Sequence, residues 1–341
     1  MNDETHVKLS VDEVASLSQR ALVSAGSSAA QAGAVAAVIA AAERDGCPQH
    51  GLLRLAGYAA SLRSNKANHN PQPVLSEISP GVLRVAADRA FAPFALAAGF
   101  EAVCAKAQQQ GIVALGINDC LHFSALWADV EPFADRGLVA LAFTAGLKRV
   151  APAGSMQPLF GTNPMAFAWP REGQPALVFD QASSAVSRGE IIIHQRAGQP
   201  LQPGWAIDVE GKPTTDAALA LAGSLLPFGG YKGSALAMMI ELLAGPLIGD
   251  LLSMESHAVD NGDGGPSLGG ELIVVLDPAR FVPDGKARLA QAEKLFEAIQ
   301  ANGDARLPSQ RRYAARSTYL REGVNIPRRL HDEITKLSGA A

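Results

Sequence analysis

Helix-like and strand-like segments alternate along the chain from residue 90 onward, and this alternation most limits the folds open to it. Residues 94–109 and 124–134 read as helices, and the β-branched runs GIVALGI and LVALAFT follow them in turn. The short runs MAFAW, ALVFD and ELIVVLD add strands, and residues 234–243 and 287–300 add helices. Because helices that alternate with strands cover the faces of a sheet, the pattern predicts an α/β fold of mixed α+β character.

The first quarter of the chain is helical. Ser10 with Glu13 three residues later forms a capping-box pattern, which predicts a helix that ends at Gly26. Residues 29–44 are nearly all alanine and valine, which predicts a second, buried helix, and leucines from residue 52 to 62 mark a third. The stretch GCPQHGLLRL between the last two helices predicts a turn that carries a single histidine, His50.

The composition excludes several classes of protein. The 341 residues carry a net charge of −4 with no basic excess, so we expect neither nucleic-acid nor membrane-surface binding. The longest apolar run, residues 234–254, is interrupted by Glu241, Gly245, Pro246 and Asp250, which predicts a buried helix. Three cysteines without C-x-x-C spacing and no secretory signal pattern predict a protein of the reducing cytoplasm without disulfides.

The sequence lacks the usual nucleotide-binding motifs. Neither G-x-G-x-x-G nor the P-loop pattern occurs, so a Rossmann or P-loop site is not expected. GGYKGS at residues 229–234 places Lys232 at the start of a helix, where it either meets a phosphate or is simply solvated. No histidine pair has metal-ligand spacing, so no metal is expected.

Two histidines are candidates for chemistry. His50 lies between two buried helices with Arg54 one turn later, so it is either an acid/base group beside an anion site or an ordinary turn residue. His122 lies between a strand and a helix, where it either meets a ligand or packs. Asp180 and Glu190 are carboxylates that either orient an imidazole or are only solvated. The basic segment 306–316 either clamps a phosphate or lies on the surface.

Five motifs in chain order carry a resemblance to a known family. HGLLRLAGY, LFGTNPMAFAWPR, GWAIDVEGKPTTD, LLPFGGYKGSALAMMIELLAG and RLPSQRRY resemble the malate/L-lactate dehydrogenase-like NAD(P)H oxidoreductases, over residues 10 to 330. HFSALWADVEPFADRGLVAL and LFGTNP most resemble its branch of Δ1-piperideine-2-carboxylate/Δ1-pyrroline-2-carboxylate reductases. The resemblance implies a non-Rossmann NAD(P)-binding fold with intertwined domains and a homodimer.

The resemblance also implies a division of the chain and of its site. Residues 1–75 would form a helical part on which 285–341 pack, 76–225 the cofactor-binding part and 226–284 the substrate and dimerisation part. The catalytic residues would be His50 as proton donor, Gln49 and Glu190, with Arg54 and Thr162 binding substrate. The residues expected along the cofactor are Arg54, His122, Phe123, Ser124, Ala125, Leu126, Thr162, Asp180, Tyr231, Lys232, Arg306, Leu307, Pro308, Arg311 and Arg312.

The sequence departs from the branch at four positions. Gln49 stands where the reductases have a serine, and Glu190 where they have an aspartate that completes a trio with the histidine. A glutamine amide hydrogen-bonds but does not pass a proton as a hydroxyl does. Leu121 replaces a polar residue, and Ser309 replaces a glycine in the RLPG turn.

The resulting hypothesis is NADPH-dependent reduction of a cyclic imino acid, with hydride to C2 and His50 at the ring nitrogen. The arginines favour NADPH for its 2′-phosphate, with NADH as the weaker alternative. Two alternatives stay open: a malate-, lactate- or ureidoglycolate-type dehydrogenase of 2-keto acids on the same fold, and a non-catalytic relative that binds cofactor.

Overall fold

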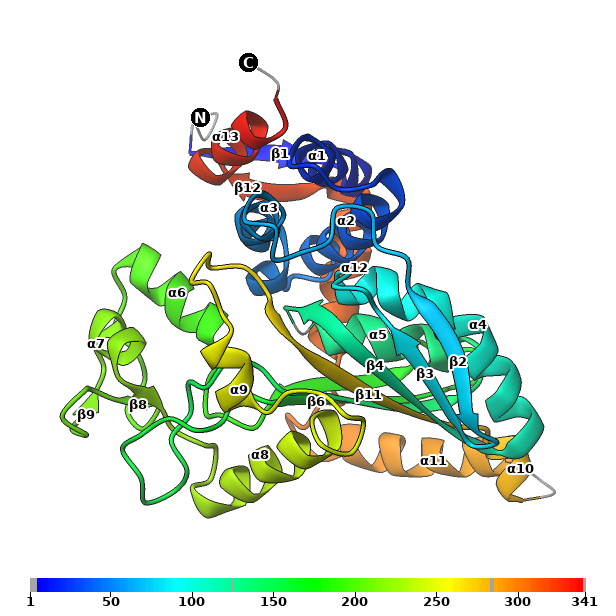
Figure 1. Cartoon of the computed structure of the whole chain (residues 1–341). Coiled ribbons are helices and arrows are strands. Elements are labelled where there is room, and N and C mark those ends of the chain that lie inside the picture. Colours follow the sequence, from blue (N-terminus) through cyan, green and yellow to red (C-terminus); the bar gives the residue numbers. More distant parts are fainter. Residues whose placement is uncertain (1–4, 124, 283–284, 340–341) are drawn as a thin grey trace.

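The protein consists of a helical bundle, a central seven-stranded sheet with helices on both faces, and a small lateral lobe (Figure 1). The structure is a computed structural model, and it describes residues 5–123, 125–282 and 285–339. Within these residues, no helix is both long enough and apolar enough to cross a membrane.

The central sheet has the strand order β2-β3-β4-β11-β5-β6-β7. Its strands are β2 (Val74–Ser79), β3 (Val82–Ala86), β4 (Ile112–His122), β11 (Ser267–Leu276), β5 (Val139–Thr144), β6 (Pro164–Trp169) and β7 (Leu177–Ala182). Only β3 and β4 pair in parallel, and the other neighbouring pairs are antiparallel. The sheet is therefore mixed, and β11 separates β4 from β5 although those two strands are closer in the chain.

Alternating side chains of the central strands fill two cores. Leu115 and Ile117 of β4 and Ile273 of β11 face the larger core, which helices α4 (Ala92–Gln110) and α5 (Leu126–Asp135) cover. Leu272 of β11 faces the smaller core against Ile240 of α8 (Tyr231–Ala244). This period of two is what a sheet buried on both faces requires.

The helical bundle packs above the sheet. It contains α1 (Val11–Ser24), α2 (Ala29–Arg44), α3 (Leu55–Arg63), α12 (Gln310–Glu322) and α13 (Arg328–Leu337), together with the antiparallel pair β1 (His6–Leu9) and β12 (Val324–Pro327). Ser10 accepts from the backbone N–H of Glu13, whose side chain accepts from the N–H of Ser10, so the predicted capping box is confirmed. The two ends of the chain thus share one bundle (Figure 1).

The lateral lobe follows β7. It is made of α6 (Arg188–Ala197), α7 (Ala217–Ala222) and a three-stranded sheet of β10 (Ser224–Leu225), β8 (Ala206–Ile207) and β9 (Pro213–Thr214). Helix α9 (Ser253–Ala258) precedes β11, and α10 (Pro278–Phe281) and α11 (Gly285–Gln300) follow it. Figure 1 places α8 and α11 along the lower face of the sheet.

The mixed α/β class predicted from the sequence is confirmed, and the long elements lie where their patterns predict. The hairpin of β2 and β3 and the helix α12 were not predicted from the sequence. Strand β11 begins at Ser267, inside a glycine-rich stretch whose composition predicts a loop. The residues 226–284 supply β11 to the centre of the sheet, and α11 lies along the sheet while α12 and α13 join the bundle. The division into three parts stays a prediction.

Candidate active site

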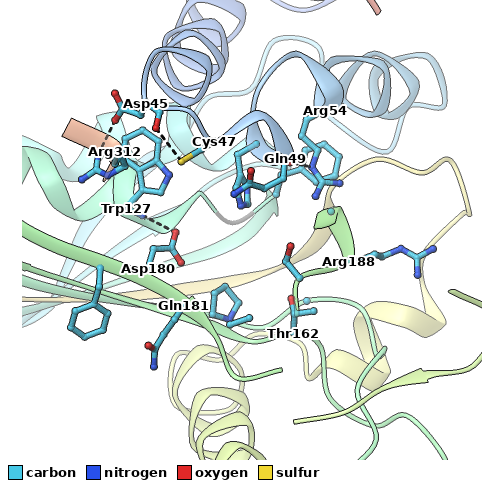
Figure 2. Close-up of a pocket in the computed structure, with 18 of the residues that line it drawn as sticks. Asp45, Cys47, Gln49, Arg54, Trp127, Thr162, Asp180, Gln181, Arg188 and Arg312 are labelled. Atoms are coloured by element: carbon cyan, nitrogen blue, oxygen red, sulfur yellow. Dashed lines mark hydrogen bonds and ion pairs between the residues drawn. The ribbon is translucent and has the colours of Figure 1, made fainter. Parts of the chain in front are cut away.

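A cavity of about 1260 Å³ lies between the helical bundle and the sheet. Its wall combines the turn before α3, the ends of β4 and β7, the first turn of α6, the loop 260–265 and the segment 306–312. Figure 2 shows Gln49 and Arg54 on one side of it, Thr162 and Asp180 on the sheet side, and Arg188 at the far end.

The turn that carries His50 is two short 3-10 helices, η1 (Pro48–His50) and η2 (Leu52–Arg54). Pro48 occupies the first position of η1, where its missing N–H costs nothing, and the His50 N–H donates to the Cys47 carbonyl over 2.9 Å. The Arg54 Nε donates to the Gln49 carbonyl over 2.7 Å, so the guanidinium folds back along the turn. His50, Gln49 and Arg54 all line the cavity.

Glu43 of α2 supports this turn from below. Its Oε1 accepts from the Leu52 N–H over 2.7 Å, and a Cβ at Gly51 would lie 2.1 Å from that oxygen, so only glycine admits the carboxyl. Burial raises the pKa of Glu43 to about 7 against the effect of the Leu52 N–H. The carboxyl is therefore an internal anchor whose charge changes near neutral pH.

His50 is uncharged at neutral pH in this structure. Burial and the nearby Arg54 and His122 lower the pKa of His50 to about 3, while a hydrogen bond with the Phe123 backbone acts in the opposite direction. Its buried Nδ1 has no hydrogen-bond partner among the described residues. A buried polar atom without a partner is uncommon in proteins, which singles out His50 among the residues of the cavity.

Three arginines gather at one end of the cavity. Arg54, Arg149 and Arg188 line it, and none of them forms an ion pair with a described carboxylate. Burial, Arg149 and Arg54 lower the pKa of Arg188 to about 10. Like charges held this close without a counter-ion form a site for an anion.

Gly189 lets α6 approach the turn. A Cβ at this position would lie 2.6 Å from Arg54 Nη2 and 3.1 Å from Gln49 Cβ. The first turn of α6, whose N-cap is Ser187, thereby packs against Arg54 and Gln49.

His122 ends β4 and lies among buried acids. Its Nε2 is 3.0 Å from Glu271 Oε2 and 3.8 Å from Asp129 Oδ2. Burial lowers the pKa of His122, but Glu271, Asp129 and Asp180 outweigh it, so the pKa is raised. Burial and Glu271 raise the pKa of Asp129 well above its usual value.

Asp180 of β7 caps α5 from outside the helix. Its Oδ2 accepts from the Trp127 N–H over 3.1 Å, as Figure 2 shows, and burial raises the pKa of Asp180 to about 7. Ala125 and Leu126 lie at the start of α5 and do not line the cavity.

The segment 306–312 divides into two roles. Arg312 donates to Asp45 over 2.8 Å and to Glu131 over 2.6 Å, and Arg316 joins the same two carboxylates, so Arg312 is held in a buried ion network. Arg306 and Arg311 line the cavity, are exposed and have no ion pair with a described residue. They are the cations of this segment that remain open to a ligand.

Most of the residues singled out from the sequence meet at the cavity. They are Gln49, His50, Arg54, His122, Phe123, Thr162, Asp180, Arg306, Leu307, Pro308, Arg311 and Arg312. Glu190 does not line it and points to His194, with Oε1 3.6 Å from Nε2. Tyr231 and Lys232 are exposed at the start of α8, outside the cavity of this chain. Ser124 lies outside the described residues.

Sequence reasoning missed the buried acids Glu43, Asp129 and Glu271 and the arginines Arg149 and Arg188. Glu43 and Glu271 stand in apolar stretches, and an ionisable residue in such a stretch was the available signal. Arg188 is two residues from Glu190, but no motif in the sequence marks it as a site residue.

The chain is similar to known oxidoreductases along nearly its whole length. The family model for malate/L-lactate dehydrogenase matches residues 9–335. A Δ1-pyrroline-2-carboxylate reductase of Ancylobacter novellus is 52% identical over 332 residues, which cover 97% of both chains. A Δ1-pyrroline-2-carboxylate/Δ1-piperideine-2-carboxylate reductase of Pseudomonas aeruginosa is 50% identical, over 97% of this chain and 99% of that one.

Solved structures share the fold. The crystal structure of Δ1-piperideine-2-carboxylate reductase from Pseudomonas syringae pv. tomato superimposes with a TM-score of 0.92 at 38% identity, covering 97% of this chain and 99% of that one. A putative malate/lactate dehydrogenase of E. coli superimposes with a TM-score of 0.90 at 26% identity, covering 98% of this chain and 95% of that one. The resemblance drawn from the five motifs is confirmed, and the chain belongs to the malate/L-lactate dehydrogenase family.

Proposed function

We propose that this enzyme reduces cyclic imino acids with NADPH, converting Δ1-pyrroline-2-carboxylate to L-proline and Δ1-piperideine-2-carboxylate to L-pipecolate. Relatives about half identical over nearly the whole chain carry these activities in their names. The observation that carries the proposal is the group of Arg54, Arg149 and Arg188 beside His50, with no carboxylate of the described residues to balance them. A small substrate that carries a carboxylate next to a basic nitrogen fits this arrangement.

The substrate carboxylate would bind Arg54 and Arg188. A planar guanidinium donates two parallel hydrogen bonds to a carboxylate, and both arginines line the cavity. The bound anion would offset the positive charge of Arg54, which is one of the causes that lower the pKa of His50. His50 then becomes easier to protonate when substrate is present than when it is absent.

His50 would serve the ring nitrogen of the imine. Its imidazole lines the cavity and would hold or give a proton there. Glu190 is directed to His194, and among the described residues no hydrogen bond joins the Gln49 side chain to His50. We propose that His50 works here without a relay.

The cavity fits a dinucleotide in size and in charge. Its volume of about 1260 Å³ exceeds that of ordinary small-molecule sites, and Arg306 and Arg311 lie on the part of the wall formed by the segment 306–312. When bound, the reduced nicotinamide supplies the hydride. Arg306 and Arg311 would bind a 2′-phosphate, which favours NADPH over NADH.

The test is an assay of cofactor oxidation with pyrroline-2-carboxylate, piperideine-2-carboxylate, pyruvate and oxaloacetate, each with NADPH and with NADH. We expect turnover of the imino acids with NADPH, and a His50→Ala variant that is slower by about 10² to 10⁴-fold. Faster turnover of the keto acids would assign the enzyme to the malate or lactate type. Cofactor binding without turnover of any of the four would contradict the proposal.

We also propose a homodimer in which α8 is covered by a second copy. Tyr231, Met238 and Leu242 are large, apolar and exposed on this helix, and Lys232 lies at its start, outside the cavity of its own chain. A Leu242→Arg variant should sediment as a monomer, with exposed Leu320→Arg as the control. The same sedimentation pattern in both variants would exclude this surface.

The cytoplasm is the proposed location. Cys47, Cys104 and Cys120 are unpaired thiols, which a reducing compartment preserves.

A further inference from the structure

The two histidines of the cavity stand in opposite electrostatic surroundings. His122 faces the carboxyl groups of Glu271 and Asp129, whereas His50 faces the guanidinium of Arg54. Both imidazoles line the same cavity and are close enough for the charge of one to disfavour charge on the other. Of the two imidazoles, His122 is therefore the one that favours the protonated, charged form.

Glu271 is the most constrained member of the acid group. It is 0% exposed, its Oε2 is 3.0 Å from His122 Nε2, and its Oε1 has no hydrogen-bond partner among the described residues. Asp129 is 4% exposed, and no lysine or arginine of the described residues pairs with either carboxyl. A buried carboxylate without a cation is costly, so the neighbouring imidazole must supply the positive charge.

We propose that Glu271 and Asp129 are positioning residues that hold a proton on His122, and that the charged His122 in turn keeps His50 neutral until substrate binds. This inference deepens the proposed function, since it assigns the control of His50 to two residues outside the cavity wall. Substrate binding would then shift the balance, because a carboxylate on Arg54 favours charge on His50.

The groups facing the two imidazoles all agree with this distribution. The pKa of His122 is raised by Glu271, Asp129 and Asp180 despite its burial, and that of His50 is lowered by burial, Arg54 and His122. Burial and Glu271 raise the pKa of Asp129, while the neighbouring His122 lowers it. Other charged or titratable groups near the set are Arg312 beside Asp180, Tyr58 beside Arg54 and Asp129, and the buried thiol of Cys120 beside Glu271 and Asp129.

A proton accounts for the geometry better than a metal ion does. The nitrogen and the two carboxylate oxygens lie within 4.8 Å of one another, but Nε2 and Oε2 are already at hydrogen-bond distance. One N–H of His122 therefore satisfies this pair without an ion between the two atoms.

The first experiment titrates the histidines directly. Protein with ¹⁵N-labelled histidine is followed by NMR from pH 3 to 9 without cofactor or substrate, and the two rings are assigned with His50→Gln and His122→Gln. In Glu271→Gln we expect His122 to titrate at lower pH than in the parent protein and His50 at higher pH. Asp129→Asn should move both in the same directions, and exposed Glu172→Gln should move neither.

The second experiment uses the pH profile of kcat/KM with pyrroline-2-carboxylate and NADPH. Its acid-side midpoint should shift to higher pH in Glu271→Gln, and adding Glu271→Gln to His122→Gln should cause no further shift. Glu271→Asp should restore the parent profile in part, which a merely structural loss would not allow. Circular dichroism and cofactor fluorescence establish that each variant is folded.

Three results would overturn the inference. The first is unchanged titration of His122 in both acid variants. The second is a His50 titration that stays the same when the charge of His122 is removed. The third is stoichiometric zinc or manganese binding that abolishes the His122 titration. The NMR arm needs no turnover, so failure of the proposed reaction and failure of this inference are distinguishable.

Discussion

At the scale of single residues, Gly189 sets how closely α6 approaches the pocket arginines. Gly189→Ala would place a methyl group 2.6 Å from Arg54 Nη2, and the flexible guanidinium must move. We expect KM to rise about tenfold, since a tenfold change corresponds to only ~1.4 kcal/mol of binding energy. Stability should be equal or higher, because alanine favours a helix over glycine. Steady-state kinetics and urea unfolding measure both.

The control for this change is Gly81→Ala. A methyl group at that glycine would meet no atom within 4 Å, and the glycine does not adopt a positive φ. It should leave KM unchanged. An unaltered KM in Gly189→Ala as well would separate α6 from substrate binding.

Ser309 is strained but bonded. It adopts φ +66°, a left-handed conformation that suits the glycine expected in an RLPG turn, while its hydroxyl donates to the Val178 carbonyl. Ser309→Ala loses the hydroxyl and keeps the strain, whereas Ser309→Gly loses the hydroxyl and relieves it. Ser309→Ala should therefore be less stable than Ser309→Gly by about 1 kcal/mol in urea unfolding. Equal stabilities would mean that the strain is absent.

His50 and Arg54 could be predicted because a single turn presents them, and local sequence defines turns. The partners of Arg312 could not. Asp45 is 267 residues away in the chain, so only the folded structure reveals that this arginine is already occupied. The same holds for the contact of His122 with Glu271, over 149 residues.

At the scale of elements, the η1–η2 turn depends on α2 through Glu43. Its pKa rises from 4.5 to about 7 on folding, so the wild-type protein loses stability from this group as pH rises through that range. Glu43→Gln keeps an acceptor for Leu52 and removes the charge. The stability of Glu43→Gln relative to wild type should therefore grow by roughly 3 kcal/mol between pH 4 and pH 8.

Urea unfolding of both proteins at each pH measures this difference. The contribution of His50 to the free energy of unfolding has the opposite pH dependence, because its lowered pKa makes the protein less stable as pH falls from 6.5 towards 3. This contribution is the same in both proteins and cancels in their difference. Glu43→Ala, which also removes the acceptor, should be less stable than Glu43→Gln throughout. A pH-independent difference between Glu43→Gln and wild type would contradict the charged anchor.

Single elements could be predicted from sequence when their own pattern was strong. Ser10 with Glu13 and the run at residues 29–44 defined α1 and α2, because capping and burial are local properties. Helix α12 could not be predicted in this way, since its exposed positions carry arginines that resemble a surface stretch. The side of α12 that faces the protein is held by ion pairs of Arg312 and Arg316. A search for regularly spaced apolar residues does not detect such a helix.

At the scale of the whole molecule, the network of Asp45, Glu131, Arg312 and Arg316 ties the bundle to a helix of the sheet layer. Arg316→Met leaves two buried carboxylates with fewer cations and should cost about 3 kcal/mol in urea unfolding. Arg321→Met, on the same helix and exposed, should change stability by less than ~0.5 kcal/mol. Similar losses of stability in both variants would show that the ion network does not stabilise the fold more than an exposed arginine does.

The order of the sheet has a consequence for synthesis on the ribosome. Strand β11 fills the space between β4 and β5, so that space stays open until residues 267–276 have emerged. At translation rates of about 5–20 residues per second, the delay after β5 is on the order of ten seconds. During that time the nascent chain displays two unpaired strand edges, and a chaperone that binds them would protect it from aggregation.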